Sequence, residues 1–143
     1  MTKYNDVLAL IGRILIAALF LPSGLSKLAA PAATQAYITA MGLPAPALIC
    51  YGAMIVELVG SILLIIGFHT RFAAYGLAIF TLLAAFLFHT NFADQNQMIH
   101  FFKNFAIVGG LLYVGVLGAG KLSLDRRFNS TATPSTDAFT PGE

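Results

Sequence analysis

The sequence predicts an all-α integral membrane protein, a four-helix bundle with both termini in the cytoplasm. Hydrophobic residues make up 58% of the 143 residues and charged residues only 10%, against about 45–50% and about 25% in ordinary soluble domains. A chain this short cannot bury so much apolar surface in a water-soluble core, because too large a share of a small fold is surface. Its apolar residues fall into four segments separated by polar or proline-containing connections. Each segment is long enough, or nearly so, to cross a bilayer as a helix.

The first span is predicted at residues 7–28 and is interrupted by Arg13. Only 13 uncharged residues separate Arg13 from Lys27. They would form roughly 20 Å of helix, less than the hydrocarbon thickness of about 30 Å. One of the two cations must therefore lie within the membrane or extend its side chain to the interface. Lys27 is near the helix end and can reach the interface, so Arg13 is the expected buried charge. Pro22 is expected to kink this helix.

The second and third spans are predicted at residues 46–68 and 72–89. A loop over residues 29–45 should precede the second span, because the stretch 42–46 combines glycine with two prolines and is typical of a chain that stops and restarts a helix. A short polar turn, residues 69–71, joins the two spans.

The last span is predicted at residues 104–120, which is 17 residues without a charge, or about 25 Å of helix. A polar connection, residues 90–103, precedes it. Because this helix would be short, Lys103 and Lys121 are expected to mark its two ends by extending to opposite interfaces.

The distribution of cations predicts the orientation of the bundle. Two cations, Lys27 and Lys103, fall on one side. The other side carries Lys3, Arg71, Lys121, Arg126 and Arg127. The more cationic side is expected to face the cytoplasm. Residues 1–128 then form the membrane domain, and residues 129–143, rich in Ser, Thr, Pro and Ala, form a disordered cytoplasmic tail.

The composition also excludes several functions. A formal net charge of +2 with scattered basic residues is too small to predict nucleic-acid binding. Cys50 is the only cysteine, so the chain alone forms no disulfide, redox pair or cysteine-based zinc site. Four-helix membrane enzymes that pass electrons from dithiols to quinone need a cysteine pair, and this chain cannot work that way alone. His89 and His100 lack a nearby carboxylate pair, so no metal site is predicted.

Helical spacing places polar groups inside the first two spans. Arg13 shares one stripe with the small residues Ala17 and Gly24, and Glu57 lies near the middle of the second span. Counted from the cytoplasmic helix ends, Arg13 lies about 9 Å deep and Glu57 about 16 Å deep. An arginine side chain can cover that difference, so we predict an Arg13–Glu57 ion pair. Such a pair either fixes helix register or handles protons or substrate, and the residues leave both interpretations open.

A second polar cluster is expected at the outer face. Lys27 ends the first span, His89 ends the third, and Lys103 and Asn104 lead into the fourth. One interpretation is a set of polar residues solvated by lipid headgroups. The other is a cationic site that binds an anion or a quinone carbonyl, with histidine able to transfer protons near neutral pH. Phenylalanines crowd the same level; they predict an interfacial aromatic belt and would also suit a flat apolar ligand.

Several short motifs resemble the DoxX family of small membrane proteins, most of all its enterobacterial inner-membrane members. The motifs are Gly12-Arg13, Phe20-x-x-Ser23-Gly24-x-x-Lys27, Glu57-x-x-Gly60, Gly67-Phe68-x-Thr70-Arg71, Phe88-His89-x-Asn91-Phe92, Lys103-Asn104 and Gly118-x-Gly120-x-x-Ser123-Leu124-Asp125. Their order and spacing are specific, although no single motif is, and they cover roughly residues 7–127.

The resemblance implies a four-helix inner-membrane protein with cytoplasmic ends and an association with membrane oxidoreductases. The family takes its name from a thiosulfate:quinone oxidoreductase subunit. The leading functional prediction is therefore a component of a quinone-linked membrane oxidoreductase system; no cofactor is evident from the residues, and quinone is the candidate ligand of the outer-face cluster. Because no electron carrier is visible, a redox partner subunit is expected, and a homo-oligomer is compatible with this interpretation.

Two alternatives stay open at this point. The chain is either a non-enzymatic binding or transport module for a small lipophilic or anionic molecule, or a scaffold for a soluble redox enzyme. The residues do not identify catalytic groups and do not decide whether the chain is itself an enzyme.

Overall fold

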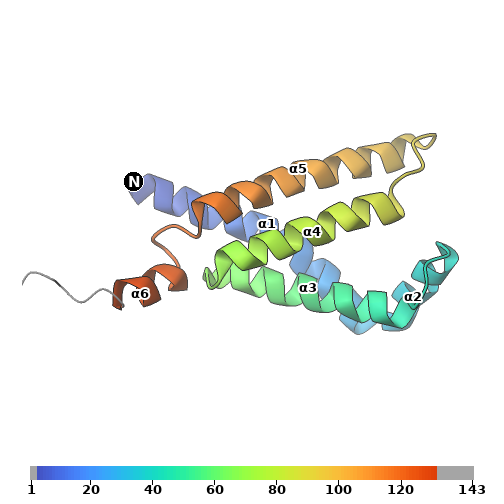
Figure 1. Ribbon diagram of the computed structural model, residues 1–143, viewed down its shortest axis with the longest axis horizontal. Coiled ribbons are helices and arrows are strands. Elements are labelled where there is room, and N and C mark those ends of the chain that lie inside the picture. The colour runs from blue at the N-terminus through green and yellow to red at the C-terminus, as the bar shows by residue number, and fades with distance from the viewer. Residues whose placement is uncertain (1–2, 132–143) are drawn as a thin grey trace, which may run out of the picture.

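The computed structural model describes residues 3–131, which form six α-helices (Figure 1). Four of them are long and apolar enough to cross a membrane: α1 (Lys3–Ala29), α3 (Pro46–Ile66), α4 (Thr70–Phe88) and α5 (Gln95–Leu117). The two short helices are α2 (Pro31–Ala40) and α6 (Leu124–Thr131). The predicted class, an all-α membrane bundle of four spanning helices, is confirmed.

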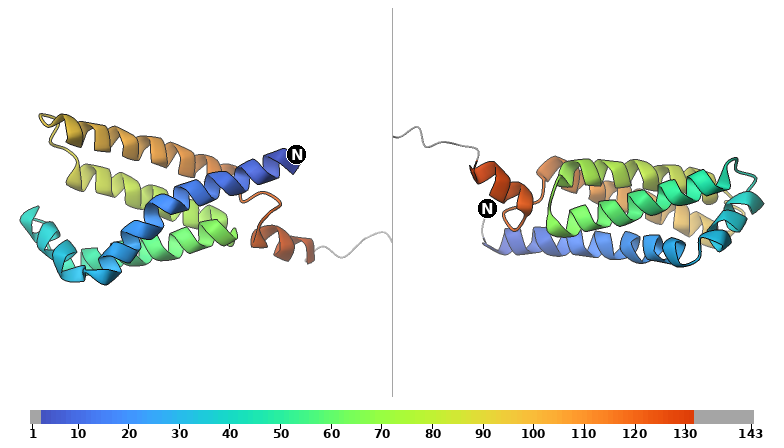
Figure 2. Two further views of the ribbon diagram at one scale, coloured as in Figure 1. Left: turned by 180° about the vertical axis from the view of Figure 1, so that it is seen from behind. Right: turned by 90° about the horizontal axis from the view of Figure 1, so that it is seen from below.

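Different segments of the chain lie at the two ends of the bundle. Figures 1 and 2 place the start of α1 and the helix α6 at one end, which we call the inner end. The helix α2 and the connection between α4 and α5 lie at the other, the outer end. That the inner end faces the cytoplasm stays a prediction. The predicted tail begins within α6, whose last residues are 129–131, and the rest of it lies outside the described residues.

The spanning helices form two pairs, α1 with α3 and α4 with α5, joined where α3 packs on α4. The pairs converge toward the inner end, and toward the outer end the α4–α5 pair diverges from α3 and α2 (Figure 1). The buried core follows this shape. Its residues are Ala17, Phe20, Leu64, Ala73, Ala74, Leu77, Ala78 and Leu111. Most come from the end of α3 and the first half of α4, so the core fills mainly the inner half of the bundle.

The predicted interior stripes of α1 and α3 are confirmed, because Arg13, Ala17 and Gly24 are buried on α1 and Glu57 is buried on α3. Gly24 brings the two helices into close contact, since a Cβ atom there would lie 2.8 Å from the Cγ atom of Leu58. Figure 2 shows α1 bending along its length, as expected of a helix with an internal proline.

Two predictions about individual elements are wrong. Residues 29–45 are not all loop, because α2 forms within them with Pro31 in its first turn, where a missing N–H costs nothing. The last spanning helix is not short: it has 23 residues and begins at Gln95. Asp94 caps the start of this helix, because its carboxylate accepts a hydrogen bond from the N–H of Asn96 at 2.8 Å. Lys103 therefore lies inside a helix and not at its beginning.

Candidate functional site

Arg13 binds backbone carbonyls and not Glu57. Its guanidinium donates to the carbonyl oxygen of Leu64 at 2.7 Å and to that of Leu122 at 2.6 Å. Leu64 is in the last turn of α3, where carbonyls lack intrahelical partners and carry the negative end of the helix dipole. Arg13 thus joins α1, the end of α3 and the connection between α5 and α6. The predicted Arg13–Glu57 ion pair is wrong.

The error lies in how far α1 extends. The depths counted from the helix ends assumed that α1 and α3 end level at the inner interface. In the structure α1 extends inward past the end of α3 (Figure 2), so Arg13 is level with Leu64. Leu64 and Glu57 are separated by roughly 10 Å along the helix, which is beyond what the bound guanidinium can bridge.

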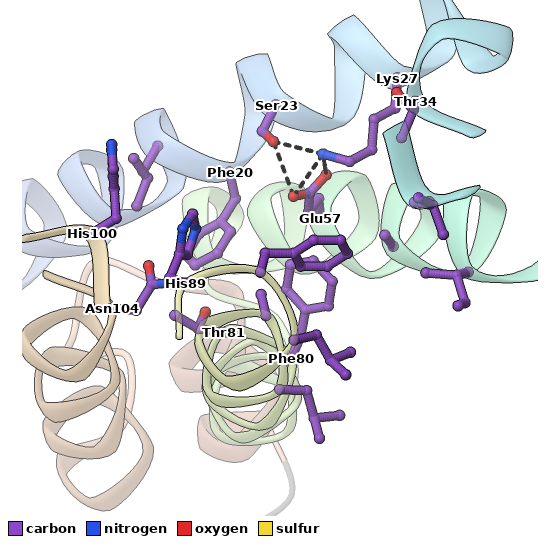
Figure 3. Close-up of a pocket in the computed structure, with 18 of the residues that line it drawn as sticks. Phe20, Ser23, Lys27, Thr34, Glu57, Phe80, Thr81, His89, His100 and Asn104 are labelled. Atoms are coloured by element: carbon purple, nitrogen blue, oxygen red, sulfur yellow. Dashed lines mark hydrogen bonds and ion pairs between the residues drawn. The ribbon is translucent and has the colours of Figure 1, made fainter. Parts of the chain in front are cut away.

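Glu57 pairs instead with Lys27 (Figure 3). Lys27 Nζ lies 2.8 Å from Glu57 Oε2 and 3.1 Å from Oε1, and it also donates to Ser23 Oγ at 2.8 Å. Ser23 Oγ in turn donates to Glu57 Oε1 at 3.0 Å. The side chains of Lys27 and Glu57 are only 19% and 5% exposed. The three residues form a compact polar group without net charge, which a site enclosed by apolar helices can tolerate.

This polar group lies on the wall of a large cavity in the outer half of the bundle. The cavity has a volume of about 990 Å³, within the range of about 300–1,000 Å³ typical of small-molecule sites. All five helices from α1 to α5 contribute to it. Leu19, Leu83 and Leu87 line the cavity and are also exposed on the outside of the bundle. The cavity therefore opens toward the surface that contacts lipid.

A second polar group completes the lining, and it comes from the end of α4 and from α5. It consists of His89, His100, Lys103 and Asn104. The rings of His89 and His100 are stacked, with centroids 5.2 Å apart and planes inclined by 24°. His89 Nδ1 lies 2.8 Å from Gln97 Oε1, and since an amide oxygen only accepts, Nδ1 is the donor. The predicted outer-face residues thus share one cavity with Lys27.

Two parts of this site were not predicted from the sequence. Ser23 and Glu57 were not assigned to it, although Ser23 is one turn before Lys27 on α1 and so on the same face. The wall formed by α2 was missed with the helix itself. Tyr37 of α2 stacks on Phe88 of α4, with ring centroids 5.7 Å apart, and both line the cavity. Within residues 3–131, no three His, Cys, Asp or Glu side chains gather where they could hold a metal ion.

At the inner end, Asp125 fastens α6 to the bundle. Its carboxylate accepts hydrogen bonds from the backbone N–H groups of His69 at 2.7 Å and Thr70 at 3.0 Å, at the start of α4. Its own N–H donates to the carbonyl of Gly67 at 2.8 Å. Burial alone would raise the pKa of Asp125, but the hydrogen bonds from Thr70 and His69 outweigh it and lower the pKa below its usual value.

This lowered pKa predicts a pH dependence for the docking of α6. A carboxylate with a depressed folded-state pKa stabilises the fold above its unfolded pKa, and the stabilisation is lost as the pH falls below about 4. Wild type should therefore melt at a higher temperature than Asp125→Asn at neutral pH, and the difference should shrink in acid. Melting curves of both proteins across this range measure it. A difference that stays constant with pH would rule out the carboxylate as the cause.

Comparison with known proteins places the chain among small bacterial membrane proteins. Residues 8–90 match the DoxX family. The chain is 42% identical over 129 residues to the inner membrane protein YqjF of Escherichia coli (strain K12), covering 90% of this chain and 98% of that protein. It is 36% identical over 128 residues to the inner membrane protein YphA of the same organism, covering 86% and 91%. No solved structure matches the chain.

Proposed function

The chain belongs to the DoxX family and is a multi-pass protein of the inner membrane, and from this premise we propose that its outer cavity binds a membrane quinone as part of a quinone-linked oxidoreductase system. One observation carries the proposal. A single cavity opens toward lipid, is mostly apolar, and has hydrogen-bonding groups on two sets of helices. A quinone is a flat ring with an oxygen at each end and an apolar tail, so it matches this distribution of groups.

The apolar part of the cavity suits the ring and the tail. Phe20, Phe80 and Phe88 line the interior, and aromatic side chains stack well on a flat ring. Leu83 and Leu87 lie where the cavity reaches the bundle surface. A tail that leaves between them enters the hydrocarbon region directly, so the ligand need not cross water to reach the site.

The polar groups of the cavity supply hydrogen-bond donors for the quinone oxygens. These oxygens only accept hydrogen bonds, and the cavity offers donors from the ammonium of Lys103 and the amide of Asn104, whereas the ammonium of Lys27 already donates to Ser23 and Glu57. Reduction of a quinone to a quinol consumes two electrons and places one proton on each oxygen. His89 and His100, close to the outer end of the bundle, are the side chains suited to exchange such protons with water.

The electrons must come from another protein. Cys50 is the only cysteine of the chain, and no side chain of the cavity can itself be oxidised by two electrons. The proposal therefore includes a partner oxidoreductase subunit that donates both electrons, while this chain holds the quinone and positions its oxygens.

A binding measurement tests the proposal. The purified chain in lipid nanodiscs should bind a short-tailed ubiquinone or menaquinone analogue saturably. Asn104→Leu removes one donor at nearly constant volume and should weaken binding about tenfold, the equivalent of one hydrogen bond. Asn96→Leu, on the exposed first turn of the same helix, is the matched control and should bind like the wild type.

Two results would overturn the proposal. One is the absence of saturable binding by a correctly folded protein, and the other is unchanged affinity in Asn104→Leu. Preferential binding of an apolar carboxylate or sulfonate would instead favour a binding or transport module. That alternative has its own support, because the lining contains two lysines, Lys27 and Lys103, against one carboxylate, Glu57.

A further inference from the structure

A second cavity lies at the inner end of the bundle, far from the quinone site along the helices. Its volume is about 800 Å³. It is bounded by the start of α4, the end of α5, the connection that follows α5, and α6. The helices α1 to α3 contribute none of its lining apart from the residues that link α3 to α4. This cavity is independent of the proposed function.

Three cations from three different segments line the inner cavity. Arg71 lies in the first turn of α4, Lys121 in the connection after α5, and Arg126 in α6. The lining contains one acidic residue, Asp125. Its carboxylate already accepts hydrogen bonds from two backbone N–H groups. Lys121 is 55% exposed and its ammonium lies 4.0 Å from Asp6, a weak pairing. With three cations and one carboxylate in its lining, the cavity carries an excess of formal positive charge.

The backbone of the connection after α5 passes close to one of these cations, Arg71. Gly118 and Gly120 have φ angles of +82° and +77°, values that favour glycine, and they turn the chain back toward α4. A Cβ atom on Gly118 would lie 3.6 Å from Nε of Arg71. The guanidinium of Arg71 therefore lies close to the connection that carries Lys121.

An exposed apolar surface continues from this cavity along α4 and α5. On α4 it consists of Phe72, Tyr75 and Ile79, which are 78%, 39% and 62% exposed. On α5 it includes Tyr113 and Leu117, which are 73% and 75% exposed. Both sets follow helical spacing, so they form stripes that run from the inner end toward the bilayer centre. A ligand bound here would contact cations in the inner cavity and apolar side chains along the stripes of α4 and α5.

We propose that the inner cavity binds the headgroup phosphate of an acidic phospholipid, whose acyl chains lie along the exposed stripes of α4 and α5. Guanidinium and ammonium groups are the usual partners of phosphate oxygens. A zwitterionic lipid gains less here, because its own cation is repelled by the same three side chains. The site holds an acidic lipid at a fixed place on the protein, in addition to the general attraction of basic residues to an anionic leaflet.

Native mass spectrometry of the detergent-solubilised protein tests this proposal, with phosphatidylglycerol and phosphatidylcholine offered in equal amounts. Wild type should retain one phosphatidylglycerol in preference. Arg71→Gln and Lys121→Gln should each reduce that retention about fivefold, the equivalent of about 1 kcal/mol per cation. Lys3→Gln removes a cation from the same end outside the cavity and should retain the lipid like the wild type.

Further measurements separate the alternatives. Equal losses in Lys3→Gln and Arg71→Gln would show general surface attraction and overturn the site. Thermal protection by inorganic phosphate in lipid-free detergent, equal to that given by phosphatidylglycerol, would overturn the lipid as occupant. Circular dichroism checks that each variant is folded, and Arg71→Lys, which keeps the charge, should recover most of the retention. Quinone binding should be the same in all these variants, so failure of either proposal leaves the other intact.

Discussion

Replacing Arg13 with glutamine should lower the free energy of unfolding by about 3 kcal/mol, because two charge-assisted hydrogen bonds are lost from a buried position. Arg13 is 1% exposed, and its partners, the carbonyls of Leu64 and Leu122, belong to segments far apart in the sequence. A shorter neutral side chain leaves these carbonyls without a donor. Thermal and chemical unfolding in detergent micelles measures the change.

The control for this prediction is Arg71→Gln, which removes an exposed arginine from the same end of the bundle. It should change the unfolding free energy by less than about 0.5 kcal/mol. Arg13→Lys should fall between the wild type and Arg13→Gln, since an ammonium on a shorter stem cannot reach both carbonyls in the same way. An Arg13→Gln protein as stable as the wild type would mean that Arg13 does not hold these segments together.

Glu57→Leu should destabilise the protein by about 3 kcal/mol, because it leaves Lys27 without a counter-charge among apolar helices. In the double variant Lys27→Met with Glu57→Leu no charge is left unpaired, and most of the lost stability should return. Comparing the unfolding of both single variants and the double variant in micelles gives the coupling between the two side chains.

The same double variant separates a structural role of the pair from a functional one. If the double variant folds well but binds the quinone analogue much more weakly, the ion pair contributes to ligand binding. If the double variant both folds and binds like the wild type, the role of the ion pair is structural and is limited to aligning α1 with α3. A double variant that is less stable than either single variant would contradict the geometry, in which Lys27 and Glu57 contact each other directly.

Local patterns in the sequence predicted much of this fold. The apolar segments determined the number of spanning helices, because hydrocarbon accepts only backbone whose polar groups are paired within it. The interior stripe through Arg13, Ala17 and Gly24 was predicted correctly, since helical periodicity depends only on residues within the same helix. The family was recognisable because its motifs keep their order along the chain.

Relations between helices were harder to predict. The register of α1 against α3 depends on how far α1 extends beyond the bilayer, and hydropathy carries no information about that, so Arg13 was paired with the wrong residue. The start of α5 depended on the carboxylate of Asp94, and its polar first turns looked like a loop. Helix α2 has no marked apolar face of its own, and so its contribution to the cavity could not be seen.

The candidate site was predicted in part. Lys27, His89, Lys103 and Asn104 were grouped because each falls at the outer end of a predicted span, and the structure places them around one cavity. Glu57 was left out because it had been assigned to Arg13. One error in register thus misassigned both Arg13 and Glu57.

The location of the buried core has a mechanical consequence. Helices fastened at one end act as levers, so a small rotation where Leu64, Leu77 and Leu111 pack becomes a larger displacement at the far end. A rotation of a given size at the core therefore changes the width of the outer half more than that of the inner half. Substitutions that enlarge the cavity at Leu83 or Leu87, which line it and lie outside the buried core, should therefore weaken the fold less than substitutions at Phe20 or Glu57.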